Sequence, residues 1–432
     1  MKSPMASMSK LALAAALSAG IAAPALFAPA AAAKKEEAKP GYKLSPAVLK
    51  VAKPAQDALQ ANDLATAETN IAAVEAGAST DDDKYVAAAL RYDLEQRKLA
   101  AAQQANPNAA LDETKLAGPL ATLYASPNTA PDAKARYAYR LGALNYNSKK
   151  YAAANQYLQQ AQQLGYKDPN LPLLLVKSKI EGGDVKGGLA DLSTVIEQTN
   201  ASGQKAPEDY YRYGISRANA AKLNPETMTW LTRYVQAYPT AKNWRDVAIM
   251  FGLQQGSIAT LDKDQKLDVY RLLRMANALA DQAHYLDYAQ TTRDRGLPGE
   301  TVAVVQEGIA KGKVPNDANT KAFLATATAA AKAEGSLSGL EAKAKSAADG
   351  KLASQTGDGY LGQGNWTKAA ELYRLALSKG AANADAVNTH LGIALTHAGD
   401  KAGAQAAFAA VKTQPRADIA ALWTAYLNQS AA

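Results

Sequence analysis

The chain lacks cysteine entirely, although it is 432 residues long. Disulfide bonds, thiolate catalysis and cysteine-based metal sites are therefore excluded. The same absence excludes a lipid-modified cysteine behind an export signal. Histidine occurs three times, and phenylalanine four times against 21 tyrosines. The chain therefore has few of the side chains, cysteine and histidine, that most often bind transition metals or act in nucleophilic catalysis.

Sequence motifs of several enzyme classes are also missing. There is no GKS or GKT phosphate loop, no HExxH zinc motif and no GxSxG nucleophile motif. The stretch 357–364 is rich in glycine, but a dinucleotide fingerprint needs a strand before it and a helix after it. Helical patterns flank this stretch on both sides. We therefore interpret its glycines as parts of a helical hairpin.

The histidines do not predict a metal site. His390 and His397 are seven residues apart on one predicted helix. Helical rise then separates their rings by about 10 Å, which is too far to share one ion. We expect both to be groove or surface side chains. No carboxylate pair stands out for acid–base work, so the sequence predicts no enzyme, no cofactor and no metal.

Long runs of one charge are absent. The formal net charge is +8, and no five consecutive residues are Lys or Arg. Nucleic-acid binding is therefore not expected. Beyond the first 33 residues no stretch approaches 18 apolar residues, so no stable membrane insertion is expected.

The first 33 residues have the pattern of a signal peptide. Lys2 and Lys10 form a basic start, residues 11–27 are apolar, and small residues at 28–33 offer cleavage sites. Cleavage would remove two lysines and no acid, which lowers the formal charge to +6. The alternative is an uncleaved anchor, which the polar and helix-breaking residues of the segment disfavour. The prediction is periplasmic localisation, possibly secretion.

A 35-residue repeat near the C-terminus is the main positive signal. Two glycine turns, each followed by Asn or Asp, tolerate a left-handed backbone. Small and aromatic residues then follow at spacings of four and three, which lie on one helix face. A single hairpin cannot bury that face, but stacked hairpins can. The two copies are Gly364, Asn365, Ala369, Tyr373, Ala376 and Gly399, Asp400, Ala404, Phe408, Val411.

The same template occurs elsewhere in the chain. Good copies have their turns near residues 62, 150 and 183, and looser ones occupy 208–252 and 295–308. The pairs Leu141-Gly142 and Leu391-Gly392 precede two of the turns. With the small and aromatic positions above, this pattern resembles the tetratricopeptide repeat (TPR) family. The resemblance implies an all-α fold, an α-solenoid of stacked helix-turn-helix repeats that binds a protein or peptide in its concave groove.

The repeats divide the chain by their regularity. We predict a signal peptide at 1–33, a charged linker at 34–44, TPR-like repeats at 45–197 and degenerate helical repeats at 198–349. Residues 350–432 hold the clearest pair and a final amphipathic helix without a partner helix, which would cap the array. That helix carries Ile419, Leu422, Trp423, Tyr426 and Leu427. A peptide-binding or membrane-surface helix is the alternative.

Candidate binding residues lie on the predicted inner helices. A basic and aromatic groove could hold an acidic or C-terminal peptide by arginine–carboxylate bonds and tyrosine stacking. Carboxylate-clamp members of the family use a Lys/Asn/Arg set on these helices, which this chain matches incompletely. The alternative is that Arg and Tyr only solvate the inner face. The candidates are Arg136, Tyr139, Arg140, Tyr146, Asn147 and Lys177.

Three functional hypotheses follow from these patterns. The first is a non-catalytic binding scaffold or adaptor of the bacterial cell envelope. The second is a structural accessory subunit of an envelope export or assembly complex. The third is an enzyme with its site within 255–345, which a buried acid–base pair in that stretch would favour.

Overall fold

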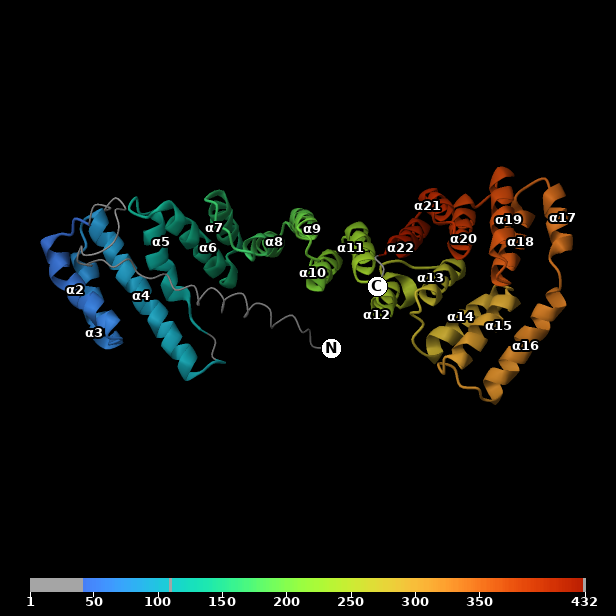
Figure 1. The fold of residues 1–432 in the computed structure, drawn as a ribbon, viewed down its shortest axis with the longest axis horizontal. Coiled ribbons are helices and arrows are strands. Elements are labelled where there is room, and N and C mark those ends of the chain that lie inside the picture. Colours follow the sequence, from blue (N-terminus) through green and yellow to red (C-terminus); the bar gives the residue numbers. More distant parts are fainter. Residues whose placement is uncertain (1–41, 109–110, 430–432) are drawn as a thin grey trace. The chain divides into compact units, whose positions relative to one another are not determined.

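The computed structural model describes residues 42–108 and 111–429, and the predicted signal peptide lies outside them. Every regular element in these ranges is helical (Figure 1). The all-α prediction is confirmed for the described residues. The chain forms two compact units that divide between Lys205 and Ala206, which we call the N-terminal and C-terminal units.

The N-terminal unit consists of helical hairpins. The clearest pairs are α2 with α3, α6 with α7, and α8 with α9, while α4 and α5 pack between the first two pairs. Its helices are α2 (Pro46–Gln60), α3 (Leu64–Gly77), α4 (Asp81–Ala105), η2 (Thr114–Leu116), α5 (Ala117–Ala125), α6 (Pro131–Asn147), α7 (Tyr151–Gln163), α8 (Leu171–Glu181) and α9 (Val185–Ala201).

The C-terminal unit continues with further hairpins, among them α10–α11, α14–α15, α18–α19 and α20–α21. Its helices are α10 (Glu208–Ala220), α11 (Asn224–Ala237), α12 (Ala241–Ala248), η3 (Ile249–Leu253), α13 (Lys263–Met275), α14 (Gln282–Asp294), α15 (Pro298–Ala310), α16 (Ala318–Glu334), α17 (Ser338–Ser346), α18 (Lys351–Gly362), α19 (Trp366–Ser378), α20 (Ala384–His397), α21 (Lys401–Ala409) and α22 (Arg416–Asn428).

The predicted turn chemistry is confirmed in the C-terminal repeats. Gly399 ends one helix at φ 80°, where a side chain would be strained. Asp400 then caps the next helix by accepting a hydrogen bond from the Gly403 backbone N–H at 2.8 Å. Gly364 and Asn365 repeat both features one period earlier. The glycine therefore reverses the chain and the following residue starts the second helix.

Close packing within the two C-terminal hairpins depends on a glycine in the first helix of each. A Cβ atom on Gly392 would lie 2.4 Å from the ring of Phe408 in the paired helix. Gly357 meets Tyr373 in the same way, at 2.8 Å. The glycine-rich stretch 357–364 is thus the end of α18 and a hairpin turn, as the sequence predicts.

Tyrosine fills large positions of the core. Tyr270 and Tyr288 stack with ring centroids 5.6 Å apart, and both are buried. Tyr42 and Tyr85 stack at 5.0 Å in the N-terminal unit. In both units Tyr therefore serves as a large packing residue.

The final described helix caps the last repeat, as the sequence predicts. It buries Ile419, Leu422 and Trp423 and packs on α20 and α21. It also packs on α11 and α13, which lie in the first part of the same unit (Figure 1). The sequence did not predict these further contacts, because an amphipathic pattern shows which face is buried but not which helices cover it.

The close approach at Gly392 predicts a stability effect. Gly392→Ala should lower the free energy of unfolding by about 1–3 kcal/mol, because Phe408 must shift to admit the methyl group. Gly339→Ala in α17 is the matched control: nothing lies within 4 Å of its new Cβ, so it should stabilise the unit by up to about 1 kcal/mol. Urea denaturation measures both; equal effects would contradict the packing argument.

Candidate functional site

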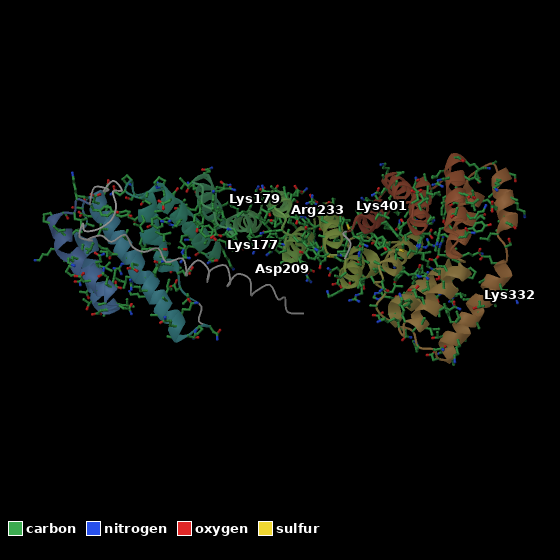
Figure 2. All side chains as sticks on the ribbon, viewed as in Figure 1. Lys177, Lys179, Asp209, Arg233, Lys332 and Lys401 are labelled. Carbon is green, nitrogen blue, oxygen red and sulfur yellow. The ribbon has the colours of Figure 1, made fainter. Side chains whose placement is uncertain are left out.

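The predicted groove residues lie on two helices that contact each other. Five come from α6 and one, Lys177, from α8. Arg136 is exposed and pairs with Asp132 at 3.2 Å, and Asn147 is also exposed. Tyr146 and Lys177 are half-buried (Figure 2 labels Lys177). These four side chains can be reached from solvent.

The other two predicted residues lie beneath that surface. Tyr139 is 5% exposed and packs its ring against Tyr166, with centroids 4.8 Å apart. Arg140 is 6% exposed, and its Nη2 atom has no hydrogen-bond partner among the described residues. Burial raises the pKa of Glu113, and the charge of Arg140 opposes that rise. Arg140 is therefore a buried cation that lies beneath the four accessible residues.

A group that the sequence did not predict lies inside the C-terminal unit. Six charged side chains from five helices meet there, and all but Asp358 are less than a tenth exposed. We call them the ionic cluster: Asp268 and Arg271 of α13, Glu300 of α15, Asp358 of α18, His390 of α20 and Arg416 of α22.

Asp268 is the centre of the ionic cluster. Its Oδ2 accepts a hydrogen bond from Arg416 Nη1 at 2.8 Å. Its Oδ1 lies 3.2 Å from Arg271 Nη1 and 3.3 Å from His390 Nε2. Its backbone oxygen accepts a hydrogen bond from Trp423 Nε1 at 3.2 Å. One fully buried residue thus joins α13, α20 and α22.

Further pairs extend the ionic cluster to three more helices. Arg271 donates two hydrogen bonds to Glu300, at 2.9 and 2.7 Å. The Tyr288 hydroxyl of α14 donates to the same carboxylate at 2.6 Å. On the other side, His390 Nδ1 lies 2.8 Å from Asp358 Oδ1. Each buried charge therefore has an oppositely charged neighbour.

The ion pairs fix the protonation states. Burial alone would lower the pKa of His390, but Asp268 and Asp358 raise it to about 9. Burial alone would raise the pKa of Asp268, but His390 and Arg416 hold it below its ordinary value. Arg271 likewise lowers the pKa of Glu300 against the effect of burial. At neutral pH His390 is protonated and the carboxylates are ionised.

This arrangement corrects the expectation for His390, which is buried rather than on the groove or surface. Buried Asp268 and Glu300 do lie within 255–345, where the sequence left an enzyme site open. A general acid or base needs a pKa near the operating pH. The pKa values of these three groups are displaced away from neutrality, so the ionic cluster is suited to holding charges in place rather than to exchanging protons.

His397 is not a member of the ionic cluster, but it lines a cavity that Arg271 and Glu300 of the cluster also line. Its ring stacks on Trp366 with centroids 4.1 Å apart. Both line a cavity of about 320 Å³, whose lining residues come from α13, α14, α15, α18, α19 and α20 and from the turn before α19. Burial, followed by Arg274 and Arg271, lowers the pKa of His397 to about 4. The ring is therefore neutral at neutral pH.

One sequence signal pointed to the ionic cluster. The segment Leu267–Leu273 is apolar around the whole helix, yet Asp268 and Arg271 lie within it. Such a helix is buried on all sides, so its charges must find partners inside the protein. The partners come from helices more than 28 residues further along the chain, and no local pattern identifies them.

Membrane-spanning helices and metal-ion clusters are both absent from the described residues. No described helix has the length and apolar character that crossing a membrane requires. Across 42–108 and 111–429, no three His, Cys, Asp or Glu side chains are grouped as a metal ion would require.

Comparisons with known proteins add little to this description. No protein-family model and no curated protein matches the chain. A crystal structure of a tetratricopeptide repeat protein from Parabacteroides merdae ATCC 43184 aligns at 12% identity, covering 81% of this chain and 100% of that chain, with a TM-score of 0.24. The APC/C hetero-tetramer Cut9–Hcn1 aligns at 11% identity over 85% and 86%, with a TM-score of 0.17. The helical hairpins of this chain themselves show its fold.

Removing the central carboxylate should destabilise the C-terminal unit strongly. Asp268→Asn leaves Arg271, His390 and Arg416 without their shared counter-charge, at a cost of about 3 kcal/mol or more. Asp246→Asn breaks an exposed pair with Lys242 in the same unit and should cost far less. All four tryptophans lie in this unit, so urea unfolding followed by tryptophan fluorescence reports on it. Similar losses in both variants would contradict the central role of Asp268.

The raised pKa of His390 predicts a pH dependence. In the folded state this pKa is about 9, against 6.5 ordinarily. The stabilisation is therefore complete below pH 6.5 and is lost as the pH rises through 9. The free energy of unfolding should fall over that interval by more than about 1 kcal/mol. In His390→Gln the fall should largely disappear, and an unchanged fall would refute the assignment.

Proposed function

We propose that this protein is a non-catalytic scaffold of the bacterial cell envelope that binds a protein or peptide through the first helices of its N-terminal repeats. The supporting observation is the contact between α6 and α8, the first helices of two successive hairpins. They carry Arg136, Tyr146, Asn147 and Lys177 within reach of solvent. Cationic and aromatic side chains on adjacent helices suit an acidic peptide.

Side chains beneath the accessible residues of α6 and α8 also favour the binding of an anionic partner. Tyr139 and Tyr166 pack together beneath it, and Arg140 places a fixed positive charge there. A positive charge attracts anionic groups on a partner. Because the Arg140 side chain is already held in place, no conformational entropy is lost in ordering it when the partner binds. The partner would therefore contact the four accessible residues, while Tyr139 and Arg140 lie beneath them and make no direct contact with it.

The envelope location rests on the sequence. The basic start, apolar stretch and small-residue cleavage sites of residues 1–33 are typical of a signal peptide. Cell fractionation tests this part separately, since a chain that stays in the cytoplasm would overturn the location and leave the binding proposal intact.

Charge reversal on α6 and α8 should weaken partner capture. Arg136→Glu with Lys177→Glu should reduce the protein captured from an envelope extract about tenfold or more, because two attractions become repulsions. The melting temperature should change little, since Arg136 is exposed and Lys177 is only half-buried. The control is Lys50→Glu, an exposed lysine of α2 in the same unit. Unchanged capture by the double variant would reject this surface.

The same experiment separates the two non-catalytic hypotheses. A changing set of clients that depends on Arg136 and Lys177 favours an adaptor. One stoichiometric complex that survives the charge reversal favours a structural subunit of an export or assembly machine.

A further inference from the structure

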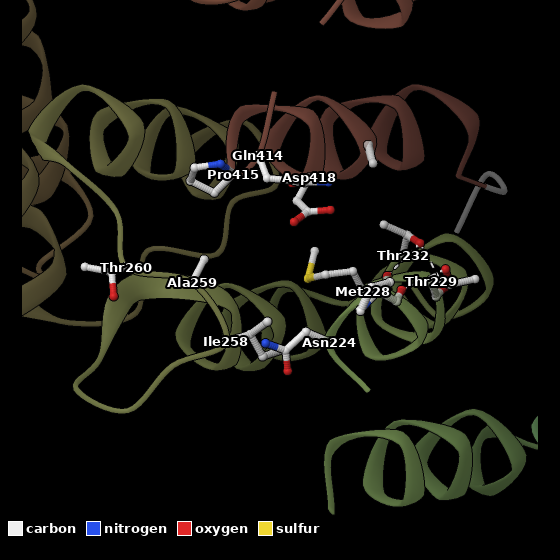
Figure 3. A pocket seen from close by; sticks show the side chains of 12 residues that line it. Asn224, Met228, Thr229, Thr232, Ile258, Ala259, Thr260, Gln414, Pro415 and Asp418 are labelled. Carbon is white, nitrogen blue, oxygen red and sulfur yellow. Dashed lines mark hydrogen bonds between the residues drawn. The ribbon is translucent and has the colours of Figure 1, made fainter. Parts of the chain in front are cut away.

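The C-terminal unit contains a pocket that neither the repeats nor the ionic cluster explain. It lies between α11, the segment 258–260 and the start of α22, and its volume is about 550 Å³ (Figure 3). Pockets of this size hold small molecules or single side chains. It is separate from the α6–α8 surface, which belongs to the other unit.

A carboxylate without a counter-ion projects into this pocket. Figure 3 shows Asp418 of α22 and Met228 of α11 facing each other across the space. Across the described part of the chain, no Lys, Arg or His lies within ion-pair distance of Asp418, whose hydrogen-bond partner is the side chain of Gln414. Burial raises the pKa of Asp418, and the Gln414 hydrogen bond opposes that rise. Bringing a cation to this carboxylate would relieve the cost of its partial burial.

Two of the three threonine hydroxyls in the lining, those of Thr229 and Thr232, present acceptors rather than donors. Thr229 Oγ1 donates its proton to the Pro225 carbonyl at 3.0 Å. Thr232 Oγ1 donates to the Met228 and Thr229 carbonyls, at 3.0 and 2.9 Å. A hydroxyl has one proton, so what these two groups offer a ligand is their lone pairs. The pocket thus suits a ligand rich in hydrogen-bond donors.

Apolar side chains complete the lining and suit an alkyl chain. Met228 and Ile258 lie on the side opposite α22, and proline rings and alanine methyl groups fill much of the rest. An unbranched chain of a few methylenes could cover these groups while its charged end reaches Asp418. The remaining apolar lining residues are Pro225, Ala259, Pro415 and Ala421.

We propose that this pocket binds an aliphatic ammonium group, with its methylene chain against Met228 and its charge on Asp418. A compact ammonium on an unbranched methylene chain needs one contact with the carboxylate, whereas a guanidinium binds best through two parallel hydrogen bonds. The N-terminal end of α22 carries roughly half a positive charge and opposes a cation, but the full charge of Asp418 outweighs it. The ammonium could belong to a lysine of a partner or to a free polyamine.

Titration of the full chain with n-pentylamine tests the proposal, with binding followed by calorimetry. Pentylamine should bind, whereas 1-pentanol and pentanoate, which lack the positive charge, should not. Asp418→Asn should weaken binding about tenfold, the value of one charged hydrogen bond. The control Asp209→Asn removes an acid from the first turn of α10, outside the pocket, and should bind like the parent.

A second variant keeps the test valid if Asp418→Asn folds poorly. Thr229→Lys places an ammonium on the exposed side of α11 within the pocket lining and should abolish pentylamine binding. Equal binding of pentanoate, or unchanged binding in both pocket variants, would overturn the proposal.

Two further probes identify the source of the ammonium. Tighter binding of a glycine-lysine-glycine peptide than of spermidine favours a partner's lysine, and the reverse order favours a free polyamine. If neither binds, the proposal fails. Partner capture through α6 and α8 is measured independently, so either proposal can fail alone.

Discussion

The buried carboxylate of Asp268 is the constraint on which the C-terminal unit depends. A charge with no access to water must be matched inside the protein, and three cations from α13, α20 and α22 match it. Because α22 is the last described helix and α13 lies in the first part of the unit, this pairing joins segments from its two ends. Simple hairpin stacking would leave those ends apart, since each repeat contacts only its neighbours.

Hairpin packing and the ionic cluster stabilise the unit in different ways. Glycines such as Gly392 bring paired helices together and act between neighbours in the sequence. The ionic cluster acts between helices that are remote in the sequence and selects one arrangement of them, because a misplaced charge would remain unpaired. Trp423 and Tyr426 strengthen this closure with hydrogen bonds to the backbone of α13. Closure in turn forms the pocket around Asp418, since its walls come from α11 and α22.

The hairpins could be predicted because their determinants are local. A left-handed turn residue, a capping side chain and a small packing position all occur within about ten residues, as at Gly399, Asp400 and Ala404. The helices that carry the candidate groove residues could be predicted for the same reason. The exposure of the groove residues could not be predicted. Arg140 and Asn147 share a face of α6, yet Arg140 is buried and Asn147 is exposed. What covers a helix face depends on segments elsewhere in the chain.

The sequence by itself determined the helices, their pairing into hairpins and the absence of cysteine chemistry, because these follow from residue type and short spacing. Only the tertiary structure decided that His390 is a buried cation, that α22 closes the unit, and that Asp418 faces a pocket with no counter-ion among the described residues. Each of these depends on contacts between residues more than 100 positions apart or on a neighbour that is missing. The spacing of apolar residues predicts which side of a helix is buried. Only the folded structure shows which residues pack against that side.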